Sequence, residues 1–212
     1  MQLASLVECL QGMELTDAPD ERLLTLSGKP YTSRSAYAAL DQVTGTPDAH
    51  GRHIWTTRVP NKVKIFAWLY FKDRLSIRTN LFAKHILDDE SCQRCSNATE
   101  DRLHVFFGCP TSAELWESTA LLSDTEVWSA NVPSHLDTNL WPFVLLTILW
   151  RIWDARNGET FRNEPSTSRR ILSKVCDDLV IWRKRLKLDS DVINSRDWHI
   201  YLLSCNSTKS SI

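Results

Sequence analysis

The sequence predicts a mainly α-helical protein, with short helices around a cysteine-rich loop, a helical C-terminal extension and at most a small β element near the N-terminus. Apolar residues recur at helical rather than alternating spacing in most segments. Prolines, serines and threonines stand where these helices would begin. Of the 212 residues, 42% are hydrophobic and 24% are charged, which favours a buried core over disorder.

The N-terminal region is predicted to lead into the first helix. Residues 1–30 form an N-terminal segment and linker, and a short strand or hairpin arm is expected at 23–31, around a glycine and a proline. Ser33 can cap the helix that follows. Residues 44–52 are expected to be a loop because they hold two glycines, a proline and an aspartate.

A helix that begins near Pro60 is predicted to be the central one. Proline suits the first turn of a helix. Apolar residues cover most of its faces, which is typical of a buried helix; they are Val59, Val63, Ile65, Phe66, Trp68, Leu69 and Tyr70. Ser76 can cap a second helix that reaches about Lys84. We expect a domain over 31–120.

The C-terminal half is predicted to be helical too. A helix begins at Pro110, a linker covers 121–139 and a helical extension covers 140–188. The extension holds one apolar helix over 140–157, stopped by Gly158, and a second that Ser166 or Thr167 opens. The first is too short to cross a bilayer, so no membrane partner is expected. Residues 189–212 are expected to be a C-terminal segment with a disordered tail.

Three cysteines and a histidine form a pattern typical of a metal site. They are Cys92, Cys95, His104 and Cys109, in the spacing C-x2-C-x8-H-x4-C. Thiolate and imidazole are the ligands that zinc prefers. A tight turn can aim the first two sulfurs at one point, while a helical turn and a break at Gly108 would bring in the second pair. Because the chain itself would supply all four ligands of the metal, we predict one structural Zn²⁺ per chain.

The alternative is three buried thiols and an unrelated histidine. The residues around the first two cysteines argue against buried core thiols, because nearly every residue from 88 to 97 is polar or charged. His85 and Cys176 are possible substitutes if one of the four ligands is wrong.

Several further motifs occur in a characteristic order. They are Tyr31-Thr-Ser-Arg-Ser-Ala-Tyr37, Ile54-Trp55, Val59-Pro60-Asn-Lys-Val-Lys-Ile-Phe-Ala-Trp68, Arg74-Leu75, Asn80-Leu81, the cysteine pair, His104-Val-Phe-Phe-Gly-Cys109-Pro110 and Leu115-Trp116. This order resembles the reverse transcriptase zinc-binding domain of plant non-LTR (long interspersed element-type) retrotransposons. The later Ile152-Trp153-Asp-Ala-Arg156-Asn157 is similar to the segment that follows this domain in such elements.

The resemblance implies a retroelement-derived zinc module. The first residues have no basic region and no cleavage site typical of a secretory leader, so an intracellular setting, nuclear or cytoplasmic, is expected. The chain contains no Tyr-x-Asp-Asp polymerase motif, and no endonuclease or ribonuclease H motif is recognised, so we expect no enzyme and no small-molecule substrate. His50, His53 and the pair Asp177-Asp178 have no evident catalytic partners, and surface solvation accounts for them. RNA, DNA or other domains of a retroelement polyprotein are the expected partners.

Basic residues are concentrated in one part of this chain, whose net charge is only −1. Between Arg52 and Lys84 there are eight basic residues and one acid. Such clusters neutralise phosphates, although they also simply solvate helices. The candidate nucleic-acid contacts are Arg58, Lys62, Lys64, Lys72, Arg74 and Arg78. Trp55, Trp68 and Trp116 could stack on bases, but their helical spacing favours core packing.

A protein-interaction module or domesticated helical scaffold is the alternative function. The helices at 140–157 and 166–187 carry broad apolar stripes with three tryptophans. Such helices must pack on each other, dimerise or meet a neighbouring domain. A dimer insensitive to salt would favour this interpretation, whereas salt-dependent RNA affinity would favour nucleic-acid binding.

Overall fold

The computed structural model describes residues 31–44, 48–96, 98–121, 128, 131–186 and 189–207. The chain divides into two compact units, Met1–Asp48 and Ala49–Ile212. The described residues are mainly helical, as predicted, and their β pairing is an isolated antiparallel bridge between Ser91 and Thr99. The β element predicted at 23–31 lies almost wholly outside the described residues. The predicted domain boundaries stay predictions.

The first unit contains one described helix, α2 (Ser33–Thr44). Its cap is Thr32 rather than the predicted Ser33. The backbone N–H of Ser35 donates to Thr32 Oγ1 at 3.0 Å, and the backbone N–H of Thr32 donates to Ser35 Oγ at 2.8 Å. This reciprocal pair satisfies two N–H groups that the first turn leaves open.

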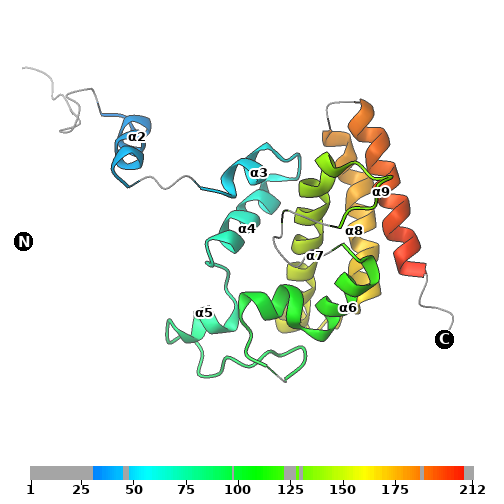
Figure 1. Ribbon diagram of the computed structural model, residues 1–212. Helices are drawn as coiled ribbons and strands as arrows, with labels where there is room; N and C mark the ends of the chain where they lie inside the picture. Colours follow the sequence, from blue (N-terminus) through cyan, green and yellow to red (C-terminus); the bar gives the residue numbers. More distant parts are fainter. Residues whose placement is uncertain are drawn as a thin grey trace, which may run out of the picture. The chain divides into compact units, whose positions relative to one another are not determined.

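The second unit is a helical bundle extended by a loop-rich region (Figure 1). Helix α7 lies between α4 and α8, and α9 packs on α8 (Figure 1). Helix α6 also packs on α8. The elements are α3 (Gly51–Thr56), α4 (Asn61–Phe71), α5 (Arg78–Phe82), the π-helix η1 (His104–Gly108), α6 (Pro110–Thr119), the 3₁₀ turn η2 (Thr138–Leu140), α7 (Trp141–Arg162), α8 (Ser168–Trp182), the 3₁₀ turn η3 (Arg183–Arg185) and α9 (Asp189–Ser207).

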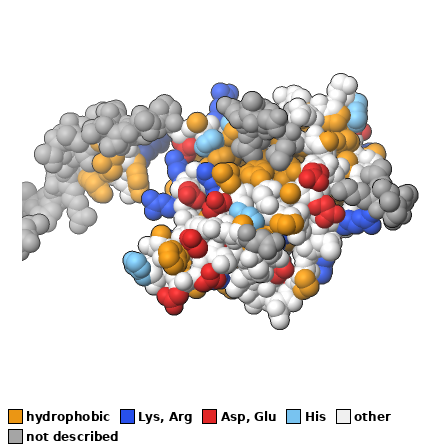
Figure 2. Space-filling model, turned by 60° about the horizontal axis from the view of Figure 1, so that its bottom comes forward, with side chains coloured by type: hydrophobic (Ala, Val, Ile, Leu, Met, Phe, Trp, Pro, Cys, Tyr) orange, Lys and Arg blue, Asp and Glu red, His pale blue; other side chains and the backbone are white. Residues whose placement is uncertain are grey.

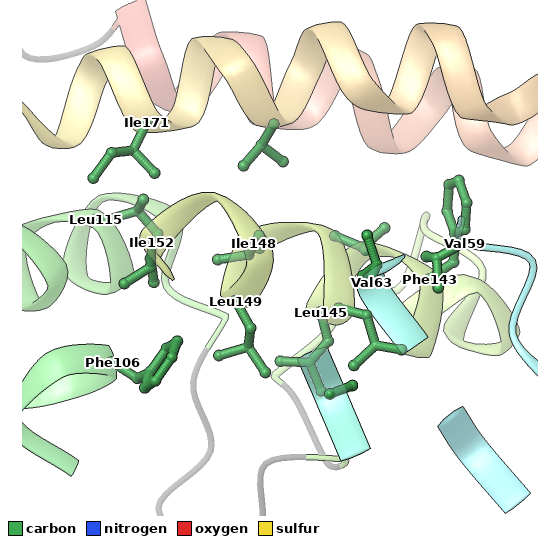
Figure 3. Close-up of a cluster of buried hydrophobic side chains, with 14 of the residues drawn as sticks. Val59, Val63, Phe106, Leu115, Phe143, Leu145, Ile148, Leu149, Ile152 and Ile171 are labelled. Atoms are coloured by element: carbon green, nitrogen blue, oxygen red, sulfur yellow. The ribbon is translucent and has the colours of Figure 1, made fainter. Parts of the chain in front are cut away.

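The centre of this unit is α7, which is buried on most faces. Ile148, Leu149 and Ile152 are fully buried, and Figure 3 shows them among side chains from α4, η1, α6 and α8. Burial of each such side chain contributes roughly 1.5–3 kcal/mol. An ion pair adds to the α7–α8 contact, because Arg151 donates to both carboxylate oxygens of Asp178 at 2.6 Å. The two helices predicted to need a partner therefore pack on each other.

The predicted end of α7 is wrong. The helix continues through Gly158 to Arg162, and Asn163 ends it with φ 58° in the left-handed region. Asn163 and Glu164 both donate their backbone N–H to the Gly158 carbonyl. Asparagine adopts this conformation more readily than other residues with a side chain. Asn163 therefore ends the helix in place of Gly158, where the end was predicted.

Two helices were not expected from the sequence. The predicted loop 44–52 overlaps α3, which begins at Gly51. Helix α9 was not predicted because it buries only Ser195, Trp198 and Leu202 while leaving other apolar residues exposed. In the part of the chain that the structure describes, no helix is both long and apolar enough to span a membrane.

Candidate metal centre

The four side chains predicted as metal ligands meet at one point. One ligand atom from each of Cys92, Cys95, His104 and Cys109 lies within 4.8 Å of the others. Cys95 Sγ lies 3.4 Å from His104 Nε2. Cys92 and Cys109 are buried, while Cys95 and His104 are half-buried. None of the three cysteines forms a disulfide.

A tight turn at one end of a short antiparallel pairing aims the first two sulfurs. The backbone N–H of Cys92 donates to the carbonyl of Ala98 at 2.8 Å, beside the bridge between Ser91 and Thr99. The backbone N–H of Ser96 donates to the carbonyl of Cys92 at 2.8 Å, and Ser96 has φ 55°. The two-residue gap thus closes into a turn with both thiols on its inner side.

The π-helical turn brings the second pair together. The backbone N–H of Cys109 donates to the carbonyl of His104 at 2.6 Å, five residues back. In an α-helix, residues five apart would point about 140° away from each other at 3.6 residues per turn. The wider π turn reduces this angle and so places the imidazole and the sulfur on the same side. Asp101 begins this turn by accepting the backbone N–H of His104 at 2.6 Å.

Hydrogen bonds favour the thiolate at Cys92 and disfavour it at Cys109. A hydrogen bond from Cys109 holds the pKa of Cys92 well below its usual range, and the backbone N–H groups of Arg94 and Cys95 act in the same direction. That shared hydrogen bond, together with burial, raises the pKa of Cys109. The donor set, three thiols and one imidazole, fits a tetrahedral Zn²⁺.

A buried ion pair fastens the loop around the centre to α7. Arg156, 1% exposed, donates from two nitrogens to the two carboxylate oxygens of the fully buried Glu100. Glu100 also accepts the backbone N–H of Arg78 at 3.0 Å. A second link joins Arg94 Nε to Glu159 Oε2 at 3.3 Å. The pair between Glu100 and Arg156 could not be predicted from the sequence, because no local pattern signals a contact between residues 56 positions apart.

Comparison with known families agrees with this geometry. Residues 31–116 match the family described as zinc-binding in reverse transcriptase. This segment fits a retroelement reverse transcriptase zinc-binding domain. The match ends before α7, so Glu100 lies inside the matched segment and Arg156 lies outside it.

A plant protein is also similar to this chain. It is named "Putative ribonuclease H protein", comes from Arabidopsis thaliana, and is 27% identical over 145 residues. The alignment covers 62% of this chain and 23% of that protein, so the chain spans about a quarter of the relative's length. No solved structure matches the chain.

The basic residues predicted to contact nucleic acid have different surroundings. Arg78 is buried, and its guanidinium donates to Asp89 at 2.9 Å. Lys64 Nζ donates to the Trp55 carbonyl at 2.8 Å, and Lys62 Nζ lies 5.2 Å from the Trp150 ring centre. The other three predicted residues are exposed: Arg58, Lys72 and Arg74.

The prediction of core packing holds for one of the three tryptophans. Trp116 is buried and donates its indole N–H to the Phe106 carbonyl at 2.7 Å. Trp55 and Trp68 are instead 52% and 40% exposed, so the prediction is wrong for them. Trp68 lies on the outer face of α4 with Lys62, Ile65 and Lys72, because α4 buries only the opposite face.

The remaining candidates have structural surroundings. Asp178 is buried in its pair with Arg151, and His50 stacks on Phe71 with ring centres 4.1 Å apart, so specific contacts rather than surface solvation account for both. His85 is exposed on a left-handed backbone and Cys176 is buried in α8. Neither belongs to the metal cluster.

Proposed function

We propose that this chain is a non-catalytic structural zinc module of retroelement origin, in which Cys92, Cys95, His104 and Cys109 hold one Zn²⁺. The single observation that supports it is the convergence of four such ligand atoms within 4.8 Å. The ion would supply a cross-link between the hairpin and the π turn. Because the four ligands come from protein and leave no position for water or substrate, the role is structural rather than catalytic.

Metal content tests this proposal directly. The purified full chain is expected to contain about one zinc per chain, and Cys95→Ser is expected to lose it. Cys205→Ser is the matched control, since it makes the same atomic change at another half-buried cysteine outside the cluster. A folded protein that contains no zinc and resists chelators would contradict the proposal. Equal zinc loss in both variants would do so as well.

Accessory binding of nucleic acid is the second part of the proposal. The outer face of α4 presents Trp68 between Lys62 and Lys72, and Arg58 and Arg74 are exposed at either end of this helix. Cations that neutralise phosphates, interleaved with an exposed aromatic ring, suit a nucleic-acid strand. Zinc would serve this activity only by fixing the surrounding fold.

Binding to labelled oligonucleotides across a salt series tests the second part. The affinity of the full chain is expected to fall steeply with salt, and Arg58→Gln/Arg74→Gln is expected to lower it about tenfold at low salt. Arg169→Gln/Arg170→Gln is the charge-matched control, at two exposed positions at the start of α8. A chain without affinity for RNA or DNA at low salt would contradict this part and leave the zinc proposal standing.

Protein interaction is the alternative function. One observation favours it: Ile193, Ile200 and Leu203 are exposed on α9 at spacings that place them on one side. A neighbouring domain of the parent polyprotein would be the partner. A dimer or domain complex that is insensitive to salt, with no RNA affinity, would select this alternative. In either case the proposed setting is intracellular, nuclear or cytoplasmic, where zinc-binding thiols stay reduced.

A further inference from the structure

Two segments that are far apart in the sequence of the helical unit come together at one cavity with cations around it. A cavity of about 240 Å³ is lined by Arg58, which precedes α4, and by Leu186, which directly follows η3. The three residues of η3 are Arg183, Lys184 and Arg185. Arg58 and Leu186, 128 positions apart in sequence, therefore line one cavity. Of the cations near it, only Arg58 and Lys64 were candidates from the sequence.

The cations on both sides of this cavity lie close enough to affect each other. Partial burial of Lys64, with repulsion from Arg58 and Arg185, lowers the pKa of its ammonium group. Among the described residues, no carboxylate forms a salt bridge with Arg58, Lys64 or the residues of η3. Positive charge is therefore in excess around this cavity, with Asp191 as its one acidic lining residue.

An exposed aromatic residue is bonded through its backbone to one of these cations. Trp55 is 52% exposed, and its carbonyl accepts the Lys64 ammonium at 2.8 Å. The exposed area of the indole adds no buried surface to the fold, but it offers a surface on which a base can stack. Figure 2 gives a contrast: the face that it turns forward carries basic and acidic side chains intermixed, with no large region of one sign.

We propose that Trp55, Arg58, Lys64 and η3 form one composite site for a single-stranded nucleic acid. Phosphates of the strand would contact the cations from both segments, and a base would stack on Trp55. This inference deepens the proposed function and rests on it, since it extends the contact surface from the matched segment into the helical extension. Stacking on Trp55 favours a single strand over a duplex, because the face of a base inside a duplex is covered by its neighbours.

The decisive variant is Lys184→Gln/Arg185→Gln, at two exposed positions of η3. Its matched control is again Arg169→Gln/Arg170→Gln, which removes the same charge roughly 20 Å away along α8. With a labelled single-stranded oligouridine, the η3 variant is expected to bind about tenfold more weakly than the control. For the η3 variant, the slope of log affinity against log salt concentration is expected to be shallower than that of the control by about 1.4.

A second variant, Trp55→Ala, tests the stacking contact. It is expected to weaken binding at least fivefold without changing the salt dependence, because it removes no charge. Zinc content and thermal unfolding of all variants serve as folding controls. If the parent chain binds the probe but η3 variant and control bind equally, the composite site is overturned while the proposed function stands. If the parent chain does not bind at all, the nucleic-acid proposal itself fails.

Discussion

The loop around the metal cluster and the bundle of α7, α8 and α9 hold their folds by different means. The bundle buries a continuous set of apolar side chains around Ile148, Leu149 and Ile152. Of the described residues between 83 and 104, only Cys92 and Glu100 are buried. The loop is therefore stabilised by a few contacts between polar groups, whereas the bundle is stabilised by its buried apolar surface. Loss of one contact should matter far more in the loop.

The largest expected effect is the removal of zinc. Structural zinc sites contribute roughly 10–16 kcal/mol of apparent binding energy, which no apolar core can replace in residues 83–104. A chelator should therefore abolish hydrogen-exchange protection in the loop, while amides of α7 and α8 remain protected. Uniform loss of protection would show that loop and bundle unfold as one unit, and unchanged protection would show that the loop needs no metal.

The next largest effect is expected where the loop meets the bundle. Arg156→Met leaves the buried Glu100 carboxylate without its partner, and breaking such a pair costs about 3–5 kcal/mol. Denaturant unfolding measures the loss. The double variant Glu100→Leu/Arg156→Met should recover most of it, since the buried charge is gone. Arg162→Met, at an exposed pair with Glu164, is the control and should change stability by less than about 1 kcal/mol.

A cavity made in the bundle should lower the free energy of unfolding only through the loss of buried apolar contacts. Leu149→Ala removes a fully buried side chain and is expected to cost about 2–5 kcal/mol in denaturant unfolding. Zinc content should stay at that of the parent chain, because Leu149 holds no ligand in place. Zinc loss on this substitution would contradict the separation of the two regions.

The smallest expected effect is at a helix cap of the bundle. Thr167 accepts the backbone N–H of Arg170 at 3.3 Å at the start of α8, so Thr167→Ala should cost about 1 kcal/mol. Thermal unfolding should show a small downward shift with no change in zinc content. Ser173→Ala, at an exposed position inside the same helix, is the control and should be neutral or slightly stabilising.

The same contrast explains what the sequence could predict. The convergence of the four cysteine and histidine side chains could be predicted because ligand type and short spacing are local signals. The prolines at 60 and 110 marked the starts of α4 and α6 for the same reason. The pair Glu100–Arg156 joins distant segments, so nothing local indicated it. Trp55 and Trp68 were misplaced because helical spacing shows that a face exists, not which face meets the core.

The π turn at His104–Gly108 has a consequence for how the length of this chain can vary. Deleting one residue between His104 and Cys109 would leave the two donors four positions apart, and an ordinary α turn would then place them about 40° apart, on the same face. Adding one residue would leave them six positions apart, and an α turn would point them about 120° away from each other. Zinc retention is therefore expected to survive a one-residue deletion in this spacer better than a one-residue insertion, and length variants scored by zinc content would reveal that asymmetry.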